Sequence, residues 1–122
     1  MSRLRVKFGS ICIGEVTYNY DIIIHTDGSV SRRKKELSKA FRSKYGHTPL
    51  TIIEVKELIE EKPEVIVIGT GIYGALPLLD IRDYITSSGV KCIVERTPEA
   101  IKIYERLCDE GRKVAAIFHV TC

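Results

Sequence analysis

The second half of the chain alternates between helix and strand patterns, and this alternation constrains the fold more than any other feature of the sequence. Val65 to Ile68 is a continuous apolar run of strand length, which is the pattern of a strand buried on both faces of a sheet. Around it the sequence predicts three helices and two further strands, which cover residues 52–61, 76–87, 90–94, 97–109 and 114–120. Such an order favours a sheet with helices packed on its faces.

Three of the predicted helix boundaries coincide with residues that have strong capping preferences. Thr51 and Glu54 have the spacing of a capping box at the start of the first helix. Thr97 followed by Pro98 predicts an N-cap with proline in the first helical position. Gly111 is placed to adopt the left-handed conformation that ends the third helix.

The first half of the chain has the alternating pattern of antiparallel strands. Strands are predicted over residues 4–8, 11–13, 20–25 and 29–32. Asp27-Gly28 is a turn signal between the last two. Residues 32–49 are basic and poor in aliphatic side chains, and they predict one or two exposed helical turns or a long loop. We therefore expect one domain over residues 1–122, a three-layer α/β fold with a mixed central sheet, helices and an N-terminal antiparallel β-hairpin layer.

Length and composition restrict the class of protein. With 122 residues, 44% of them hydrophobic and 29% charged, the chain has the composition of a globular domain. The longest stretch without a charge, Val65 to Leu79, is too short to span a bilayer, and the first eight residues lack the apolar core of a signal peptide. The four cysteines form no CxxC pair and are expected to be reduced thiols. We expect a cytoplasmic protein that does not associate with membranes.

The sharpest local motif is a glycine loop after the apolar run. Gly69, Gly71 and Gly74 spell GxGxxG between a predicted strand and a predicted helix, and Glu95 ends the following strand. In form this is a dinucleotide fingerprint, in which glycines and a helix amino end receive a pyrophosphate. The chain has only one such mononucleotide-binding unit, and Pro77 delays the helix. A tight turn at the carboxyl edge of the sheet is the favoured interpretation, while a dinucleotide, a smaller anion or a metabolite remain alternatives.

The charge is unevenly distributed along the chain. Residues 1–49 hold ten Lys and Arg against four acidic residues, although the net charge of the whole chain is only +3. The basic segment over residues 32–44 carries seven of these cations with Phe41 among them, a composition that nucleic-acid phosphates could recruit. A solvated protein face has the same composition, and the small net charge disfavours nucleic acid as a partner.

Two further constellations lie near the carboxyl end. His119 and Cys122 would point to opposite faces of a strand, so we predict neither a metal site nor a Cys–His pair but a histidine satisfied within the fold. Arg112 follows the last helix, where it can bond the final carbonyl groups. Together with Tyr104 it could also line a pocket beside the glycine loop.

Four segments carry a resemblance to a known family: IGTG (68–71), RTPEAIKIYERL (96–107), EGRKVAA (110–116) and FHVTC (118–122). They resemble the Mth-type domains, a small uncharacterised family that takes in archaeal hypothetical proteins, the adipogenesis-associated Mth-domain protein and, more distantly, a mitochondrial complex I assembly factor. The resemblance implies a three-layer α/β fold around a mixed sheet and no established reaction; the assembly-factor branch suggests protein binding without catalysis. Glu105 departs from the family, in which many members carry Asn at this position.

We therefore expect a non-catalytic module that binds a protein partner or a small metabolite at the carboxyl edge of the sheet. The candidate binding residues are Gly69, Thr70, Gly71, Ile72, Tyr73, Thr97, Tyr104 and Arg112. No catalytic residue, metal site or cofactor is predicted. A nucleotide- or anion-binding enzyme that uses the Gly69–Gly74 loop is the alternative, and nucleic-acid binding through residues 32–44 is a third. Both a monomer and a homodimer are compatible with the sequence.

Overall fold

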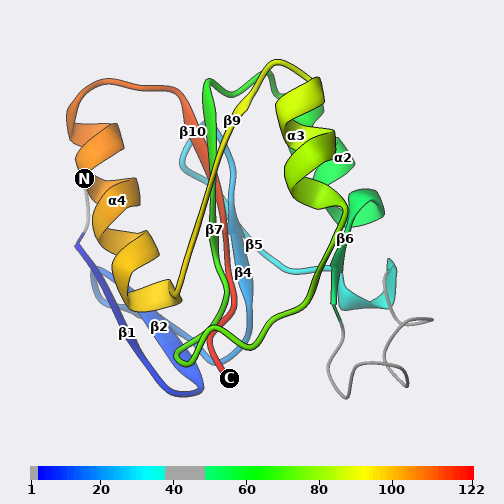
Figure 1. The fold of residues 1–122 in the computed structure, drawn as a ribbon. Coiled ribbons are helices and arrows are strands. Elements are labelled where there is room, and N and C mark those ends of the chain that lie inside the picture. Colours follow the sequence, from blue (N-terminus) through cyan, green and yellow to red (C-terminus); the bar gives the residue numbers. More distant parts are fainter. Residues whose placement is uncertain (1–2, 38–48) are drawn as a thin grey trace.

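In the computed structural model of the chain, which describes residues 3–37 and 49–122, a five-stranded mixed sheet lies between two covering layers (Figure 1). In spatial order its strands are β5 (Val30–Arg32), β4 (Ile22–Ile24), β10 (Val114–Phe118), β7 (Val65–Gly69) and β9 (Lys91–Glu95). Within the described residues the α-helices are α2 (Ile52–Glu60), α3 (Ile81–Ser87) and α4 (Thr97–Asp109). Strand β10 runs parallel to β7 and antiparallel to β4. The predicted α/β fold with a mixed sheet is confirmed.

Two smaller sheets complete the described part of the fold. The N-terminal one is antiparallel and contains β1 (Leu4–Lys7), β2 (Ser10–Ile13) and β3 (Val16–Tyr18). The other is a short parallel pair, β6 (Leu50–Thr51) and β8 (Leu78–Leu79). Helices α2 and α3 cover one face of the five-stranded sheet, whereas α4 and the N-terminal sheet cover the other (Figure 1). No helix in these described ranges is long and apolar enough to cross a membrane.

The interior strand β7, between β10 and β9, is buried on both faces, as its apolar sequence predicts. Val65 and Val67 pack into the core beneath α4, and Ile66 and Ile68 pack into the core beneath α2 and α3. All four side chains are fully buried. Because successive side chains of a strand point to opposite faces, a strand between two helical layers has to be apolar at every position.

The order of the parallel strands places their carboxyl ends together. The chain leaves β7, passes through α3 to the outer strand β9, and returns through α4 to β10 on the other side of β7. Crossover connections between parallel strands are almost always right-handed. The first crossover moves outwards across the sheet and the second moves back, so α3 and α4 lie on opposite faces of the sheet. The segments that follow β7, β9 and β10 therefore meet at one edge.

One predicted helix begins later than expected, and three short strands, β3, β6 and β8, are absent from the predictions. The helix predicted over residues 76–87 begins only at Ile81, because residues 78–79 pair with β6 and the Leu50 N–H donates to the Pro77 carbonyl (2.9 Å). The strand β3 was not predicted; it pairs with β2 after a turn at Gly14. Its side chains are largely exposed, so burial does not impose an alternating pattern on them.

The three capping predictions have different outcomes. Gly111 has the predicted left-handed conformation after α4 (φ +77°), Thr51 is a cap in position but not in chemistry, and Thr97 is not the cap of its helix. Thr51 is the N-cap of α2, yet its side chain makes no capping hydrogen bond, and the Glu54 carboxylate accepts bonds from Arg33. Helix α4 begins at Thr97 itself, with Arg96 as the N-cap. In the basic segment, residues 35–37 form a single 3₁₀ turn, and the prediction for residues 38–48 lies outside the described residues.

Candidate functional site at the carboxyl edge of the sheet

Several segments that are far apart in the sequence converge at the carboxyl edge of the sheet (Figure 1). The glycine loop, residues 69–74, follows β7; Thr97 follows β9; and residues 119–122 follow β10. The N–H of His119 donates to the Gly69 carbonyl (3.0 Å), and the N–H of Thr97 donates to the Gly71 carbonyl (3.0 Å). The tip of the β1–β2 hairpin joins them through a bond from the Gly9 N–H to the Val120 carbonyl (2.8 Å).

The main-chain amides of the glycine loop are all used inside the protein. Every amide from residue 70 to residue 76 donates to an acceptor of this chain. Those of Ile72 and Tyr73 reach the main-chain oxygens of Thr121 (2.8 Å) and Cys122 (3.2 Å). A phosphate cradle needs several free amides that converge on one point. In this structure the loop instead holds residues 121–122, and α3 begins too late to direct its amino end at the glycines.

Close packing explains why glycine stands at two of these positions. Gly71 has a φ of +110°, and a Cβ atom there would overlap the main chain of Cys122 and lie 2.8 Å from Cδ2 of His119. A Cβ atom at Gly69 would lie 2.7 Å from Oγ1 of Thr97 and 2.9 Å from the Phe118 ring. The glycines thus allow three chain segments to approach one another, a role that requires no ligand.

Thr97 ties these segments together with its hydroxyl group. Oγ1 accepts a hydrogen bond from the Gly71 N–H (2.9 Å) and donates one to the His119 carbonyl (2.6 Å). The residue is fully buried. The predicted helix cap is therefore a cross-link between the ends of β7 and β10.

A buried charge cluster, formed by Asp21, Arg33, Glu54 and His119, lies next to this edge. The Arg33 guanidinium donates from Nε and Nη2 to the two carboxylate oxygens of Glu54 (2.7 and 2.9 Å) and from Nη1 to Oδ2 of Asp21 (3.1 Å). His119 places Nδ1 2.7 Å from the same Asp21 oxygen. All four residues are less than 5% exposed. Buried charges of this kind persist only when they are paired and hydrogen-bonded.

Asp21 is held in its ionised form by its neighbours. Burial alone would raise the pKa of its carboxyl group. The hydrogen bond with His119, the charge of that histidine, the Val120 N–H (2.9 Å) and the Lys35 ammonium group (3.5 Å) outweigh this effect and hold the pKa well below its usual value. Asp21 therefore carries a negative charge over the whole physiological pH range.

His119 continues the chain of hydrogen bonds towards a hydroxyl group. Its Nε2 atom lies 3.2 Å from Oγ1 of Thr121, so that Asp21, His119 and Thr121 form a carboxylate–imidazole–hydroxyl series. In hydrolases such a series activates the hydroxyl for attack on a carbonyl group. Here the imidazole is 3% exposed, and the neighbouring loop amides that could stabilise an oxyanion donate to residues 121 and 122 instead. The series positions the end of the chain, and the predicted satisfied histidine is confirmed.

The structure brings six of the eight predicted site residues together and leaves two elsewhere. The six are Gly69, Thr70, Gly71, Ile72, Tyr73 and Thr97. Tyr104 is in the core, 4% exposed, with its ring edge-on to Phe118 at a centroid distance of 5.8 Å. Arg112 precedes β10 and donates to Glu64, which precedes β7 (Nε to Oε2, 2.8 Å). It is therefore at the opposite end of both strands, and neither residue can share a pocket with the loop.

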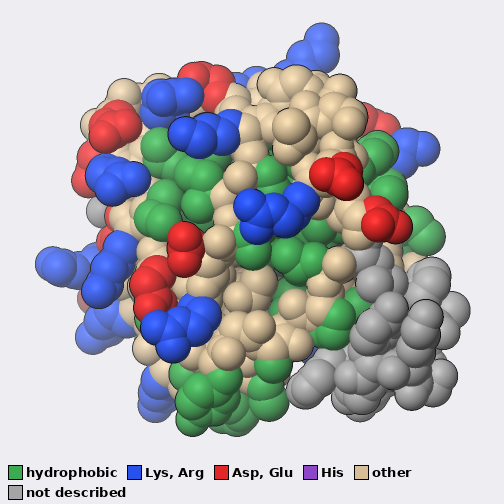
Figure 2. Space-filling view, in the orientation of Figure 1, with side chains coloured by type: hydrophobic (Ala, Val, Ile, Leu, Met, Phe, Trp, Pro, Cys, Tyr) green, Lys and Arg blue, Asp and Glu red, His purple; other side chains and the backbone are tan. Residues whose placement is uncertain are grey.

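The sequence did not predict an exposed pair of aromatic side chains, of which only Tyr73 was among the candidate site residues. Phe8, at the tip of the β1–β2 hairpin, and Tyr73, in the glycine loop, have ring centroids 6.2 Å apart and are 56% and 73% exposed. Figure 2 shows hydrophobic side chains at the bottom of the molecule, where this hairpin tip and the loop lie in Figure 1. We call these two residues the Phe8–Tyr73 patch. The sequence predicted Phe8 as the last residue of a strand, and no local signal links it with Tyr73.

The four cations at the described start of the basic segment, residues 32–35, all interact with other groups of the chain. The Arg32 guanidinium lies 4.8 Å from the centre of the Tyr20 ring, and Arg33 belongs to the buried charge cluster. Lys34 and Lys35 pair with carboxylates, that of Glu57 at 3.0 Å and that of Asp21 at 3.5 Å. The interpretation of residues 32–35 as four cations available to phosphates is therefore wrong for Arg33. The basic residues at positions 39, 42 and 44 lie outside the described residues.

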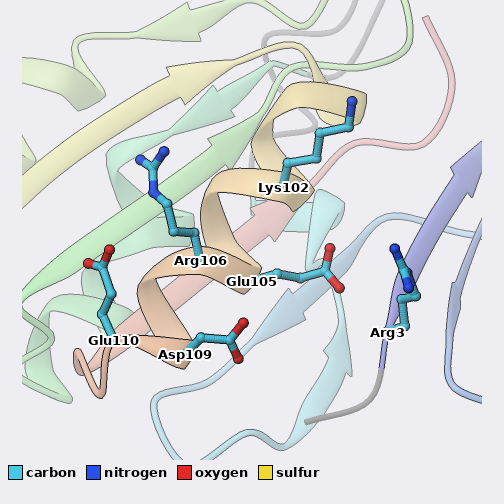
Figure 3. Close-up of a pocket in the computed structure, with 6 residues that line it drawn as sticks. All are labelled: Arg3, Lys102, Glu105, Arg106, Asp109 and Glu110. Atoms are coloured by element: carbon cyan, nitrogen blue, oxygen red, sulfur yellow. The ribbon is translucent and has the colours of Figure 1, made fainter.

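A surface cavity of about 600 Å³ lies beside the outer face of α4 (Figure 3). Its lining consists of three cations and three anions: Arg3, Lys102, Glu105, Arg106, Asp109 and Glu110. Glu105 is already engaged, because its carboxylate accepts the Leu4 N–H (3.2 Å). The charged groups point in different directions and do not converge on one point (Figure 3). The balanced charge gives no preference for an anionic or a cationic ligand. Over the described ranges, no three His, Cys, Asp or Glu side chains gather in a way that could hold a metal ion.

These features define a three-layer α/β domain whose carboxyl edge is closed by its own chain. A family model described as "Protein of unknown function (DUF498/DUF598)" matches residues 4–119, and the chain belongs to this family. The solved structure of MT938 is 42% identical over the whole of both chains, with a TM-score of 0.83. A conserved hypothetical protein from Pyrococcus horikoshii OT3, PH1505, is 33% identical over 98% of this chain and 99% of its own, with a TM-score of 0.84.

A more distant structure shares the fold alone. It is a Bordetella pertussis protein described as a Mth938-like domain, which is 16% identical over 98% of this chain and 85% of its own, with a TM-score of 0.58. The predicted resemblance to Mth-type domains is confirmed by these matches. They join this chain to proteins of unknown function and assign no reaction to it.

Proposed function

We propose that this chain is a non-catalytic binding module that docks a protein partner through the Phe8–Tyr73 patch at the carboxyl edge of the sheet. The observation that carries the proposal is the exposure of two adjacent aromatic rings on an edge where every amide from residue 70 to residue 76 already donates within the chain. Aromatic side chains are enriched in the cores of protein interfaces and often dominate their binding energy.

The rigidity of the edge supports this proposal. The amide of Tyr73 is bonded to Cys122, and the hairpin tip that carries Phe8 is bonded to Val120 through Gly9. A side chain on a backbone that is already ordered loses less conformational entropy on binding than one on a flexible loop. The patch is therefore suited to act as a preformed anchor.

The same hydrogen bonds argue against the alternative of a nucleotide- or anion-binding enzyme. A small anion would have to displace residues 121–122 from the amides of Ile72, Tyr73 and Ala75. The buried imidazole of His119 has no free access to a substrate. A cytoplasmic location is part of the proposal, and the four free thiols support it, since they are typical of reducing compartments.

Site-specific photo-crosslinking tests the proposed surface. A benzophenone amino acid would replace Tyr73 in one variant and Ile53 in a control, in cells that make this protein. Ile53 is 53% exposed on α2 and belongs to another face. We expect a discrete adduct with one protein from position 73 and none from position 53. An absence of any adduct at position 73, or the same adduct from both positions, would overturn the proposal.

A second measurement separates binding from folding. The purified partner identified by crosslinking would be titrated against Phe8→Ser/Tyr73→Ser and against Ile53→Ser. Both substitute exposed apolar side chains, so both are expected to unfold within a few degrees of the parent. The double variant should lose at least about tenfold in affinity, since buried aromatic anchors contribute more than about 1 kcal/mol each. Equal affinities of the two variants would contradict the assignment.

A further inference from the structure

The outer strand β9 has one edge that no described strand covers. It is the last strand of the five-stranded sheet, and within residues 3–37 and 49–122 it pairs with β7 alone. Its three central residues are half-buried, whereas every residue of β7 is buried. In Figure 1, β9 is the strand nearest the viewer, with α4 on one side of it and α3 on the other. In the same orientation, hydrophobic side chains reach the middle of the surface between charged ones (Figure 2).

The register of β9 shows which main-chain groups point outwards. The Lys91 N–H donates to the Glu64 carbonyl (3.1 Å), and the Glu95 carbonyl accepts the Thr70 N–H (2.9 Å). Main-chain groups alternate along a parallel ladder, so those of residues 91, 93 and 95 face β7. The N–H and C=O groups of Cys92 and Val94 therefore face away from the sheet.

We propose that β9 pairs with β9 of a second copy of this chain, antiparallel and about a two-fold axis at Ile93. In this register Cys92 lies opposite Val94 of the second copy, and the reverse pair follows by symmetry. Residues directly opposite each other at a closely spaced position of an antiparallel ladder exchange both N–H···O=C bonds. The four outward-facing donors and acceptors of each strand are then all satisfied, and the two sheets become continuous.

The charges of the strand support this occupant and this direction. Lys91 and Glu95 are exposed, lie on one face of the strand and stand two residues on either side of Ile93. The two-fold register puts Lys91 of each copy opposite Glu95 of the other, which forms two complementary cross-strand pairs. A parallel arrangement would bring like charges together. A closed antiparallel pair is therefore favoured over an open stack of strands.

The other edge of the sheet is less suited to pairing. Strand β5 has only three residues. The hydroxyl of its middle residue, Ser31, lies 2.8 Å from Nε2 of His25. Short edge strands are one of the means by which proteins avoid pairing edge to edge. Strand β9 has five residues and no proline, and its regular pairing with β7 runs without a bulge over its whole length.

Charge reversal with mixing tests this inference. Sedimentation equilibrium over a concentration series would compare the parent chain with Lys91→Glu and Glu95→Lys. Each substitution places like charges opposite each other twice, and we expect dimerisation to weaken by about tenfold or more. An equimolar mixture of the two variants should dimerise as tightly as the parent, because the heterodimer restores an opposite charge at both pairs.

Recovery on mixing distinguishes the proposed register from a general loss of stability, since unfolding of either variant would not be repaired by the other. Phe8→Ser/Tyr73→Ser serves as the matched control and should dimerise like the parent, so this inference stands apart from the proposed function. A parent chain that stays monomeric at every concentration would overturn the inference. So would variants that dimerise like the parent, or a mixture that shows no recovery.

Discussion

The glycine loop and the buried charge cluster close the same edge of the sheet by different physical means. The loop does so with main-chain hydrogen bonds and with the absence of side chains at Gly69 and Gly71. The cluster does so with side-chain charges brought in from α2 and from segments that flank β4, β5 and β10. The first depends on how closely backbones can approach, and the second on complete pairing of buried charges. Each is therefore vulnerable to a different kind of substitution.

Removal of the central cation should give the largest effect. Arg33→Met leaves the carboxylates of Asp21 and Glu54 buried without their guanidinium partner, and we expect a loss of about 3–5 kcal/mol in the free energy of unfolding. Urea denaturation measures this loss. Arg32→Met is the matched control; it removes only a cation–π contact with Tyr20, and less than about 1 kcal/mol should be lost. Similar losses in the two variants would contradict the role given to the cluster.

A methyl group at Gly71 should give the next largest effect. Its Cβ atom would overlap the Cys122 main chain at a positive φ, and Gly71→Ala should cost about 2–4 kcal/mol. Gly28 also has a positive φ (+87°) but open space around its Cβ position, so Gly28→Ala isolates the conformational part, about 1–2 kcal/mol. The difference between their unfolding free energies reports the close approach itself. If the two losses are equal, the packing argument for the loop fails.

The hydroxyl of Thr97 offers a smaller and purely polar test. Thr97→Val keeps the shape of the side chain but leaves the Gly71 N–H and the His119 carbonyl without their partner, at a cost of about 1–3 kcal/mol. Thr17 is exposed, and Thr17→Val should change stability by less than about 0.5 kcal/mol. The comparison is made by thermal unfolding of both variants. An unchanged Tm for Thr97→Val would show that this cross-link does not stabilise the edge.

The smallest effect is a pH dependence that belongs to the cluster and not to the loop. The pKa of Asp21 is lower in the folded protein than in the unfolded chain, so the unfolded chain binds the proton more readily. The stability that Asp21 contributes is complete above its unfolded pKa and is lost as the pH falls from about 4 towards the folded pKa. In a plot of the free energy of unfolding against pH, Asp21→Asn should reduce the slope below about pH 4 by up to about 1.4 kcal/mol per pH unit. Parallel acid limbs for the parent and the variant would contradict this.

Local signals in the sequence were reliable where one segment decides its own structure. The apolar run 65–68 and the helix over 97–109 form as predicted, because the repeat of apolar residues matches the period of each element. The predicted start of the helix at residue 76 was wrong, because residues 78–79 form a strand that pairs with β6. Strand β6 comes before α2 in the chain, so a local pattern could not reveal this pairing. The prediction that Tyr104 lines a pocket beside the glycine loop failed for a similar reason. The side of α4 that faces the sheet depends on where β10 lies, and Tyr104 is on that side.

The candidate site shows the same division. The glycine loop was found because glycines at fixed spacing after a strand report a backbone that turns sharply. The loop does not form the anion-binding site that its motif suggests, because two of its amides donate to the main-chain oxygens of residues 121 and 122. Those residues follow a different strand, β10, so the motif itself could not reveal the contact. No motif links Asp21 with His119, which are 98 positions apart, and their pairing follows from the antiparallel contact of β4 with β10.

The sequence by itself determined the fold class, the buried interior strand β7 and the need for glycine at the end of that strand. These follow from short-range physics: which faces of an element are apolar, and which backbone conformations a side chain forbids. Only the tertiary structure decided that the glycine loop binds its own chain, that Arg33 is buried while Arg32 is not, and that β9 is left at the edge. Those outcomes depend on the order of the strands, because it determines which distant donors, acceptors and charges are close enough to pair.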